Sequence, residues 1–199
     1  MIISDKLGAR LSAAMVEAEV ITSDKSEIYA YCYSYLFDKI IFTIYIVLTG
    51  IVMRHPLSGL ILLCVLLPLR SLCGGVHADT QIVCSILSFA LPPFAILLSL
   101  YAVPFHPLVS IPVFSVSLII LLLTAPVGNK NKPMNKDKYT KLKKALIIYS
   151  IPLTAIFSLL IYFDIKELYI LTAICTLCCA VSVLLGIIKN RRQGVCTSI

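Results

Sequence analysis

The stretch that decides the fold class is "LYILTAICTLCCAVSVLLGII", residues 168–188, which carries no charged side chain over 21 positions. A helix needs roughly 20 apolar residues to cross the hydrocarbon core of a bilayer, so this run can span one. Three more runs share the property: residues 82–103, 108–126 and 146–163. The whole chain has a mean hydropathy of +0.97 and only 14% charged residues, which excludes an ordinary soluble domain. The sequence therefore predicts an all-α membrane protein.

Two shorter apolar segments, residues 40–53 and 57–69, precede these four runs. The first can extend back to Leu36 if Asp38 and Lys39 lie at the membrane interface. Each segment is either a short spanning helix or one arm of a re-entrant hairpin. Counting both gives six transmembrane helices, two of them short.

The N-terminal 30 residues have a different pattern. Apolar side chains recur there at three- and four-residue steps, and charged residues occupy other positions of the helical wheel. This periodicity predicts an amphipathic helix within residues 1–30 that lies at the membrane interface. Residues 31–199 are expected to form a single transmembrane domain.

Basic residues predict the orientation of the chain. The segment "NKNKPMNKDKYTKLKK" between the fourth and fifth expected spans contains seven lysines. Positively charged loops stay in the cytoplasm, so this loop and both termini are expected there. Topology and contact with anionic lipid head groups explain most of the net charge of +7, although capture of an acidic partner is an alternative. The pattern does not indicate nucleic-acid binding.

The eight cysteines do not suggest a disulfide framework, because none falls in an expected outer loop. The cluster "CTLCC" at 175–179 resembles a metal-binding spacing, but it has no second cluster or nearby histidine. Packing of small polarizable side chains between helices is the better interpretation, and we expect no metal and no cofactor.

Polar residues gather in "LRSLCGGVHADTQIVC", residues 69–84. A cysteine attacks an acyl group as its thiolate and needs a nearby base, which His77 can supply. Cys84 and Cys73 are the candidate nucleophiles. Gly74 and Gly75 can bend sharply and present amide N–H groups to an oxyanion.

Helix geometry limits how His77 and Cys84 can meet. On one straight helix they would be separated by two turns, roughly 10 Å, whereas proton transfer needs about 3 Å. The helix must therefore begin after His77, or the two side chains meet across a subunit interface. Cys73 precedes the glycine pair rather than lying on a rigid element, so Cys84 is favoured. The spacing alone is also compatible with a purely structural pair.

Arg70, "CGGVHA" at 73–78 and the following Cys84 resemble the signature of the accessory gene regulator B (AgrB) peptidases. The six expected spans, the length near 200 residues, the N-terminal helix and "TAPVGNKNKP" at 124–133 resemble that family too. The resemblance implies a homodimeric cysteine endopeptidase of bacterial quorum sensing, embedded in the cell membrane with its active site on the cytoplasmic side. Its implied substrate is a pheromone precursor of the AgrD type, with an acidic C-terminal tail.

The resemblance also implies residue functions. Cys84 would attack the bond between core and tail, His77 would act as base and then acid, and the core would close into a thiolactone or lactone. Binding of the substrate or its oxyanion falls to Arg70, Gly74 and Gly75. The acidic tail would be attracted by Lys136, Lys138 and Lys141. Asp79 either polarises His77 or is a solvated residue at a helix start. The alternative is a membrane peptide exporter or scaffold without proteolytic activity.

Overall fold

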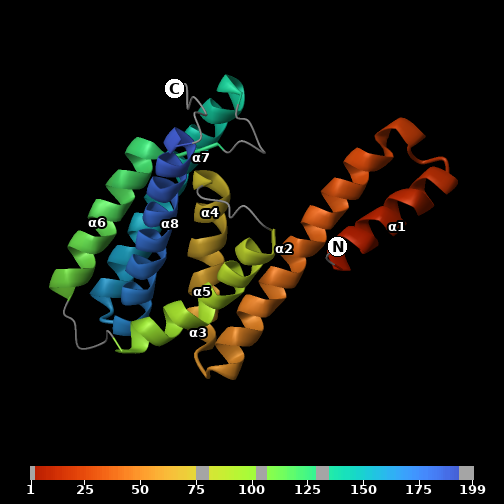
Figure 1. The fold of residues 1–199 in the computed structure, drawn as a ribbon. Helices are drawn as coiled ribbons and strands as arrows, with labels where there is room; N and C mark the ends of the chain where they lie inside the picture. The colour runs from red at the N-terminus through yellow and green to blue at the C-terminus, as the bar shows by residue number, and fades with distance from the viewer. Residues whose placement is uncertain (1–2, 75–80, 102–106, 129–134, 193–199) are drawn as a thin grey trace. The chain divides into compact units, whose positions relative to one another are not determined.

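The computed structural model describes residues 3–74, 81–101, 107–128 and 135–192, and nearly all of them are helical (Figure 1). Within these residues the only β-type pairing is an isolated bridge between Gly74 and Val127. The predicted all-α class is therefore confirmed. The chain divides into two compact units, Met1–Leu48 and Thr49–Ile199. The predicted boundary near residue 30 stays a prediction.

The first unit contains α1 (Ile3–Glu17), the short turn η1 (Ser23–Lys25) and most of α2 (Ser26–Val52). Helix α1 lies against the start of α2 through small side chains. A Cβ at Gly8 would lie only 2.6 Å from the carbonyl oxygen of Ala30, and Ser12 Oγ donates to the carbonyl of Ser26 at 2.6 Å. Such small residues allow two helix backbones to approach closely.

Two elements are longer than the sequence suggests. Helix α2 begins at Ser26, and the second segment runs without interruption from Pro56 to Cys73 as α3 (Pro56–Ile61), η2 (Leu62–Leu66) and α4 (Leu67–Cys73). Among the described residues, five helices are long and apolar enough to cross a membrane, and both of these belong to the five. The charged pair Asp38–Lys39 does not end α2, because helices continue readily through a polar interface.

A proline explains the irregular turn in the middle of the second segment. Pro68 has no N–H, so it cannot bond the carbonyl of Cys64 four residues earlier, and η2 is a π-type turn at this point. Tyr149 of α7 (Lys136–Tyr162) donates its hydroxyl to that carbonyl. A backbone group freed inside a membrane bundle thereby regains a partner.

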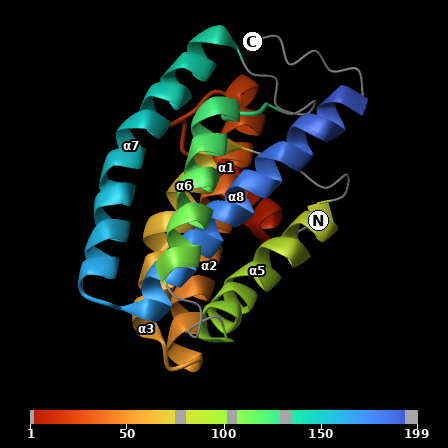
Figure 2. The same ribbon diagram turned by 90° about the vertical axis from the view of Figure 1, so that its left-hand side faces the viewer.

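Helix α8 (Lys166–Arg192) is the central helix of the second unit. Of its apolar 18-residue stretch, 61% is buried inside the bundle. It packs against α4, α7, α5 (Gln81–Tyr101) and α6 (Pro107–Thr124), as Figures 1 and 2 show. Both helices carry buried small side chains, including Ser110 and Ser117 of α6 and Ala173 and Ala180 of α8. Close packing of this kind holds helices together where lipid gives no hydrophobic driving force.

The second unit has two chemically different ends. At one end α4, α6 and α8 finish and α7 begins, and we call this the basic end (Figure 1). Its described basic residues on α7 and α8 are Lys136, Lys138, Lys141, Lys143, Lys144, Lys189 and Arg191. At the opposite end the carboxylate of Glu167 bonds His55 and Ser58. Among the described candidate residues from the sequence, Arg70, Gly74, Lys136, Lys138 and Lys141 belong to the basic end.

Candidate active site

The bend after α4 is built by Gly74. This residue has φ 68° and ψ −135°, a conformation that side chains with a Cβ rarely adopt. A Cβ here would also collide with the carbonyl oxygen of Val127. The N–H of Gly74 donates to the carbonyl of Arg70 at 3.2 Å, so this amide already has a partner inside the chain. In the described geometry Gly74 contributes a sharp bend rather than a free amide for an oxyanion.

Arg70 presents a cation without an acidic partner among the described residues. Its Nη1 donates to Ser182 Oγ of α8 at 3.1 Å, and the side chain is half-buried. Two ion pairs among the described residues, His55–Glu167 and Lys166–Asp164, lie at the opposite end. A guanidinium partly removed from water is costly unless an anion pairs with it. Arg70 can therefore accept a carboxylate brought by a ligand, with the planar geometry that suits one.

The two candidate thiols lie in different settings. Cys73 is 0% exposed, and its carbonyl accepts the N–H of Val127 at 3.0 Å. A substrate cannot reach this thiol without opening the bundle. Cys84 lies in the first turn of α5, although its side chain lies outside the described part of the structure. The start of a helix favours negative charge and is a common place for reactive thiolates.

The other predicted residues of this stretch, Gly75, His77 and Asp79, lie outside the described residues. In the sequence all three fall between Gly74 and Gln81, the first residue of α5. Whether the imidazole of His77 meets the thiol of Cys84, within one subunit or between two, stays a prediction.

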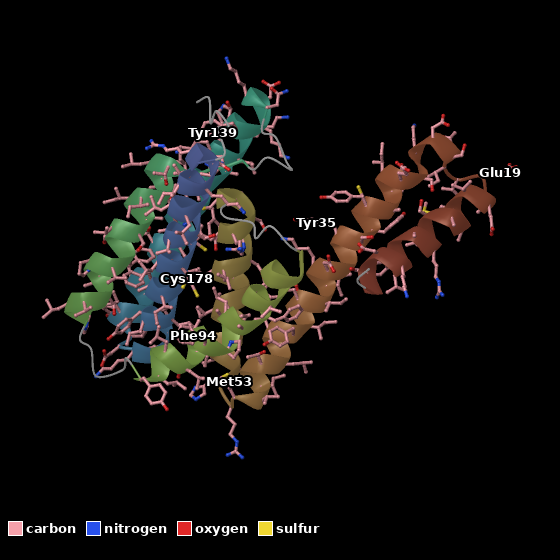
Figure 3. All side chains as sticks on the ribbon, in the orientation of Figure 1. Glu19, Tyr35, Met53, Phe94, Tyr139 and Cys178 are labelled. Atoms are coloured by element: carbon pink, nitrogen blue, oxygen red, sulfur yellow. The ribbon has the colours of Figure 1, made fainter. Side chains whose placement is uncertain are left out.

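The lysines of α7 separate into two groups. In the first turns of this helix, where Tyr139 is labelled in Figure 3, the exposed lysines are Lys136, Lys138 and Lys141. Lys143 instead turns inward, and its Nζ donates to the carbonyls of Leu122 and Ala125. Lys143 was not predicted from the sequence, because nothing in a run of lysines distinguishes the one that faces a neighbouring helix.

Asn190 of α8 was not predicted either. It is 4% exposed, and its Nδ2 donates to the carbonyl of Gly128 at 2.9 Å. Its position beside Lys189 and Arg191 gives it the appearance of a residue in a polar tail. Only the path of residues 125–128 shows that it is a contact inside the bundle.

The cysteines of α8 lie inside the bundle, and Cys178 and Cys179 are close enough to Arg70 to interact with its charge. Cys175 and Cys179 are buried, and Cys178 of the same helix is labelled in Figure 3. In the part of the chain that the structure describes, no three His, Cys, Asp or Glu side chains are grouped to hold a metal ion. The functional features described at the basic end are thus the cations of Arg70 and the lysines and the bend at Gly74.

Comparison with known proteins identifies the family. The sequence pattern of the family described as Accessory gene regulator B matches residues 6–188. The chain belongs to the AgrB family. It is also 30% identical to an AgrB-like protein of Clostridium perfringens (strain 13 / Type A), over 78% of each chain. No solved structure matches it.

AgrB membership confirms the resemblance found in the sequence. The family match includes residues of both compact units. It gives the protein a role in agr quorum sensing, a system in which AgrB proteins are linked to peptide processing. It also implies a peptide partner of the AgrD type. Together with the apolar helices, it makes this chain a multi-pass membrane protein.

Proposed function

We propose that this AgrB chain is a membrane-embedded cysteine endopeptidase that removes the C-terminal tail of an AgrD-type precursor. Cys84 is the nucleophile and His77 the general base. Three features support the proposal: the family match over residues 6–188, the place of Cys84 in the first turn of α5, and the burial of the competing thiol of Cys73.

The observation that carries the proposal is the environment of Arg70. Its guanidinium lies four residues before the bend at Gly74, has a neutral partner in Ser182, and has no carboxylate partner among the described residues. A peptide with an acidic segment would supply the missing anion. Binding that anion would also hold the substrate beside the stretch that carries His77 and Cys84.

The reaction conserves atoms and needs no redox partner. His77 takes the thiol proton of Cys84, and the thiolate attacks the carbonyl carbon between core and tail. The tail leaves as a free amine after it receives that proton from His77, and a thioester joins the core to Cys84. A thiol or hydroxyl of the core then attacks the thioester, its proton passing through His77 to the released Cys84 sulfur. The product is a cyclic thiolactone or lactone.

The exposed lysines of α7 have a second function in this proposal. Lys136, Lys138 and Lys141 are solvent-exposed cations at the same end of the bundle as Arg70. Charges of this kind attract an oppositely charged segment and increase the rate of encounter. We therefore assign them to recognition of the acidic tail of the precursor.

Co-expression with a precursor tagged at its C-terminus tests the proposal. Cys84→Ala and His77→Ala should each reduce release of the tagged tail by at least about a thousandfold at unchanged membrane levels, because a nucleophile and its base act as a unit. Cys73→Ala is the matched control and should still cleave. Tail release that persists in both the Cys84→Ala and His77→Ala variants would show a non-proteolytic protein, such as an exporter or scaffold.

Two additions to the same assay refine the proposal. Reversing the charge of Lys136, Lys138 and Lys141 to Glu should raise the precursor concentration needed for half-maximal cleavage. Unchanged processing would remove them from tail recognition. Co-expressing the Cys84→Ala and His77→Ala chains should restore cleavage only if the two side chains meet across a dimer interface.

A further inference from the structure

Residues 125–128 form a short link after α6 that is held from three sides. The first contact is with the end of α4. Val127 donates its N–H to the carbonyl of Cys73 at 3.0 Å and pairs with Gly74 in a parallel bridge. Two chain segments that are far apart in the sequence therefore share their backbone hydrogen bonding at the basic end.

The second contact comes from α7. Lys143 donates from Nζ to the carbonyl of Ala125 at 2.7 Å and to the carbonyl of Leu122 in the last turn of α6. Carbonyls at the end of a helix lack partners within that helix, and a cation there is favoured by the helix dipole. Lys143 thus fixes the point at which the link leaves α6.

The third contact comes from α8. The buried amide of Asn190 donates from Nδ2 to the carbonyl of Gly128 at 2.9 Å. Lys143 and Asn190 therefore hold the two ends of the link, and Val127 between them meets the bend of α4. Hydrogen bonds constrain directions as well as distances, so such a network specifies one backbone path.

The link lies against the residue at which the chain leaves α4. The carbonyl of Val127 lies where a Cβ of Gly74 would be, so the link limits the direction that the chain can take after this residue. Three residues further along the sequence is His77. We propose that Lys143 and Asn190 are positioning residues, which hold residues 125–128 against Gly74 and thereby aim the segment that carries His77. This inference rests on the proposed thiol–imidazole chemistry.

The test measures the reactivity of Cys84 itself. The purified full-length protein in lipid nanodiscs is treated with iodoacetamide at a series of pH values, and mass spectrometry follows alkylation of the peptide that contains Cys84. A neighbouring imidazolium favours the thiolate, so pairing with His77 should bring half-maximal alkylation to lower pH. His77→Ala supplies the profile of the unpaired thiol, and tail release from the tagged precursor is measured in parallel.

Lys143→Met removes both hydrogen bonds while keeping the length of the side chain. We expect tail release to fall roughly 10- to 100-fold, as is typical when the support of a reactive group is removed. The alkylation profile should move toward that of His77→Ala. Lys143→Arg keeps a long cation and should restore most of both readouts. Lys144→Met removes the same charge from the next residue, for which the described structure shows no hydrogen bond, and should match the parent chain.

Asn190→Ala is the milder second variant if Lys143→Met does not accumulate, and it should shift the alkylation profile in the same direction. A loss of stability alone would lower the amount of folded protein without changing the profile of the folded fraction. The positioning inference is overturned if His77→Ala shifts the profile and neither Lys143→Met nor Asn190→Ala does. If His77→Ala shifts nothing and tail release persists, the proposed function fails, and the inference fails with it.

Discussion

Gly74 combines two constraints that few positions share. Its φ of 68° with ψ of −135° belongs to a region that L-residues avoid, and the Val127 carbonyl occupies the space of a side chain. The first constraint is local, whereas the second depends on a segment about fifty residues later in the sequence. The glycine is therefore required by the fold, whatever its chemical function.

We predict that Gly74→Ala lowers the free energy of unfolding by about 1–3 kcal/mol, the usual cost of such a backbone conformation. The displaced Val127 carbonyl should also loosen the bend and reduce precursor cleavage. Denaturant-induced unfolding of the purified protein in detergent measures the first effect. Lys144→Ala, at an exposed position of the same end of the bundle, should change stability by no more than about 0.5 kcal/mol. Equal stability of Gly74→Ala and the parent would contradict the described bend.

Cys64 and Tyr149 show how one residue identity depends on another. Pro68 leaves the carbonyl of Cys64 without its helical donor, and the hydroxyl of Tyr149 takes that place. In a bundle surrounded by lipid no water is available for the same purpose. The tyrosine on α7 therefore compensates for a proline on α4.

Among whole elements, α3 and α8 are joined at the end opposite to the candidate site. Glu167 in the first turn of α8 accepts from His55 Nδ1 at 2.9 Å and from the buried Ser58 hydroxyl. A carboxylate is favoured at a helix start by the dipole. This small polar network fixes the turn between α2 and α3 to the central helix.

We predict that Glu167→Ala lowers the free energy of unfolding by about 2–3 kcal/mol, since two bonds to a charged acceptor are lost and Ser58 is left buried. Glu167→Gln keeps the shape and should have an intermediate effect. Lys166→Ala, which breaks only the exposed pair with Asp164 at 3.7 Å, should cost less than about 1 kcal/mol. Thermal unfolding in detergent gives all three values. A Glu167→Ala effect no larger than that of Lys166→Ala would show that the network does not join the helices.

The packed face of helix α1 depends on the neighbouring helix α2. The sequence draws attention to its apolar positions, yet Leu7 and Leu11 are 40% and 39% exposed. The face that meets α2 contains Gly8 and Ser12 instead. The helix itself was predictable from its period, but the packed face was decided by which side chains allow the closest approach.

For the whole molecule, the excess of basic residues at one end of the second unit is the dominant feature. The basic end carries the lysines of α7 together with Lys189 and Arg191, with Asp137 as an acidic residue of α7, whereas Asp164 and Glu167 share the opposite end with the basic residues Arg54 and Lys166. Basic segments remain in the cytoplasm during membrane insertion. The basic end, with Arg70 and the bend, is therefore predicted to face the cytoplasm.

Single cysteines added at the two ends test this orientation. In intact cells a membrane-impermeant maleimide should label Lys166→Cys, whereas Thr140→Cys should react only after the membrane is permeabilised. The parent chain, labelled in parallel, gives the background from its own thiols. Labelling of Thr140→Cys in intact cells, with protection of Lys166→Cys, would invert the predicted topology.

The sequence by itself determined the membrane class, the main apolar helices, the basic loop and the stretch that carries Arg70, His77 and Cys84. These features depend on the length of uncharged runs and on local charge, which need no knowledge of neighbours. The family resemblance could be recognised from the sequence for a related reason, because a motif consists of residues that are close together in the sequence.

Only the tertiary structure decided which groups are available. It buries the thiol of Cys73 and gives Arg70 the neutral partner Ser182. It also pairs the amide of Gly74 with the carbonyl of Arg70. Lys143 and Asn190 donate hydrogen bonds to carbonyls of residues 125–128. Each outcome depends on contact between segments far apart in the sequence, and the helical period of one segment does not specify its partner. Burial and hydrogen bonding are properties of the packed bundle, because they depend on which other atoms have displaced the solvent.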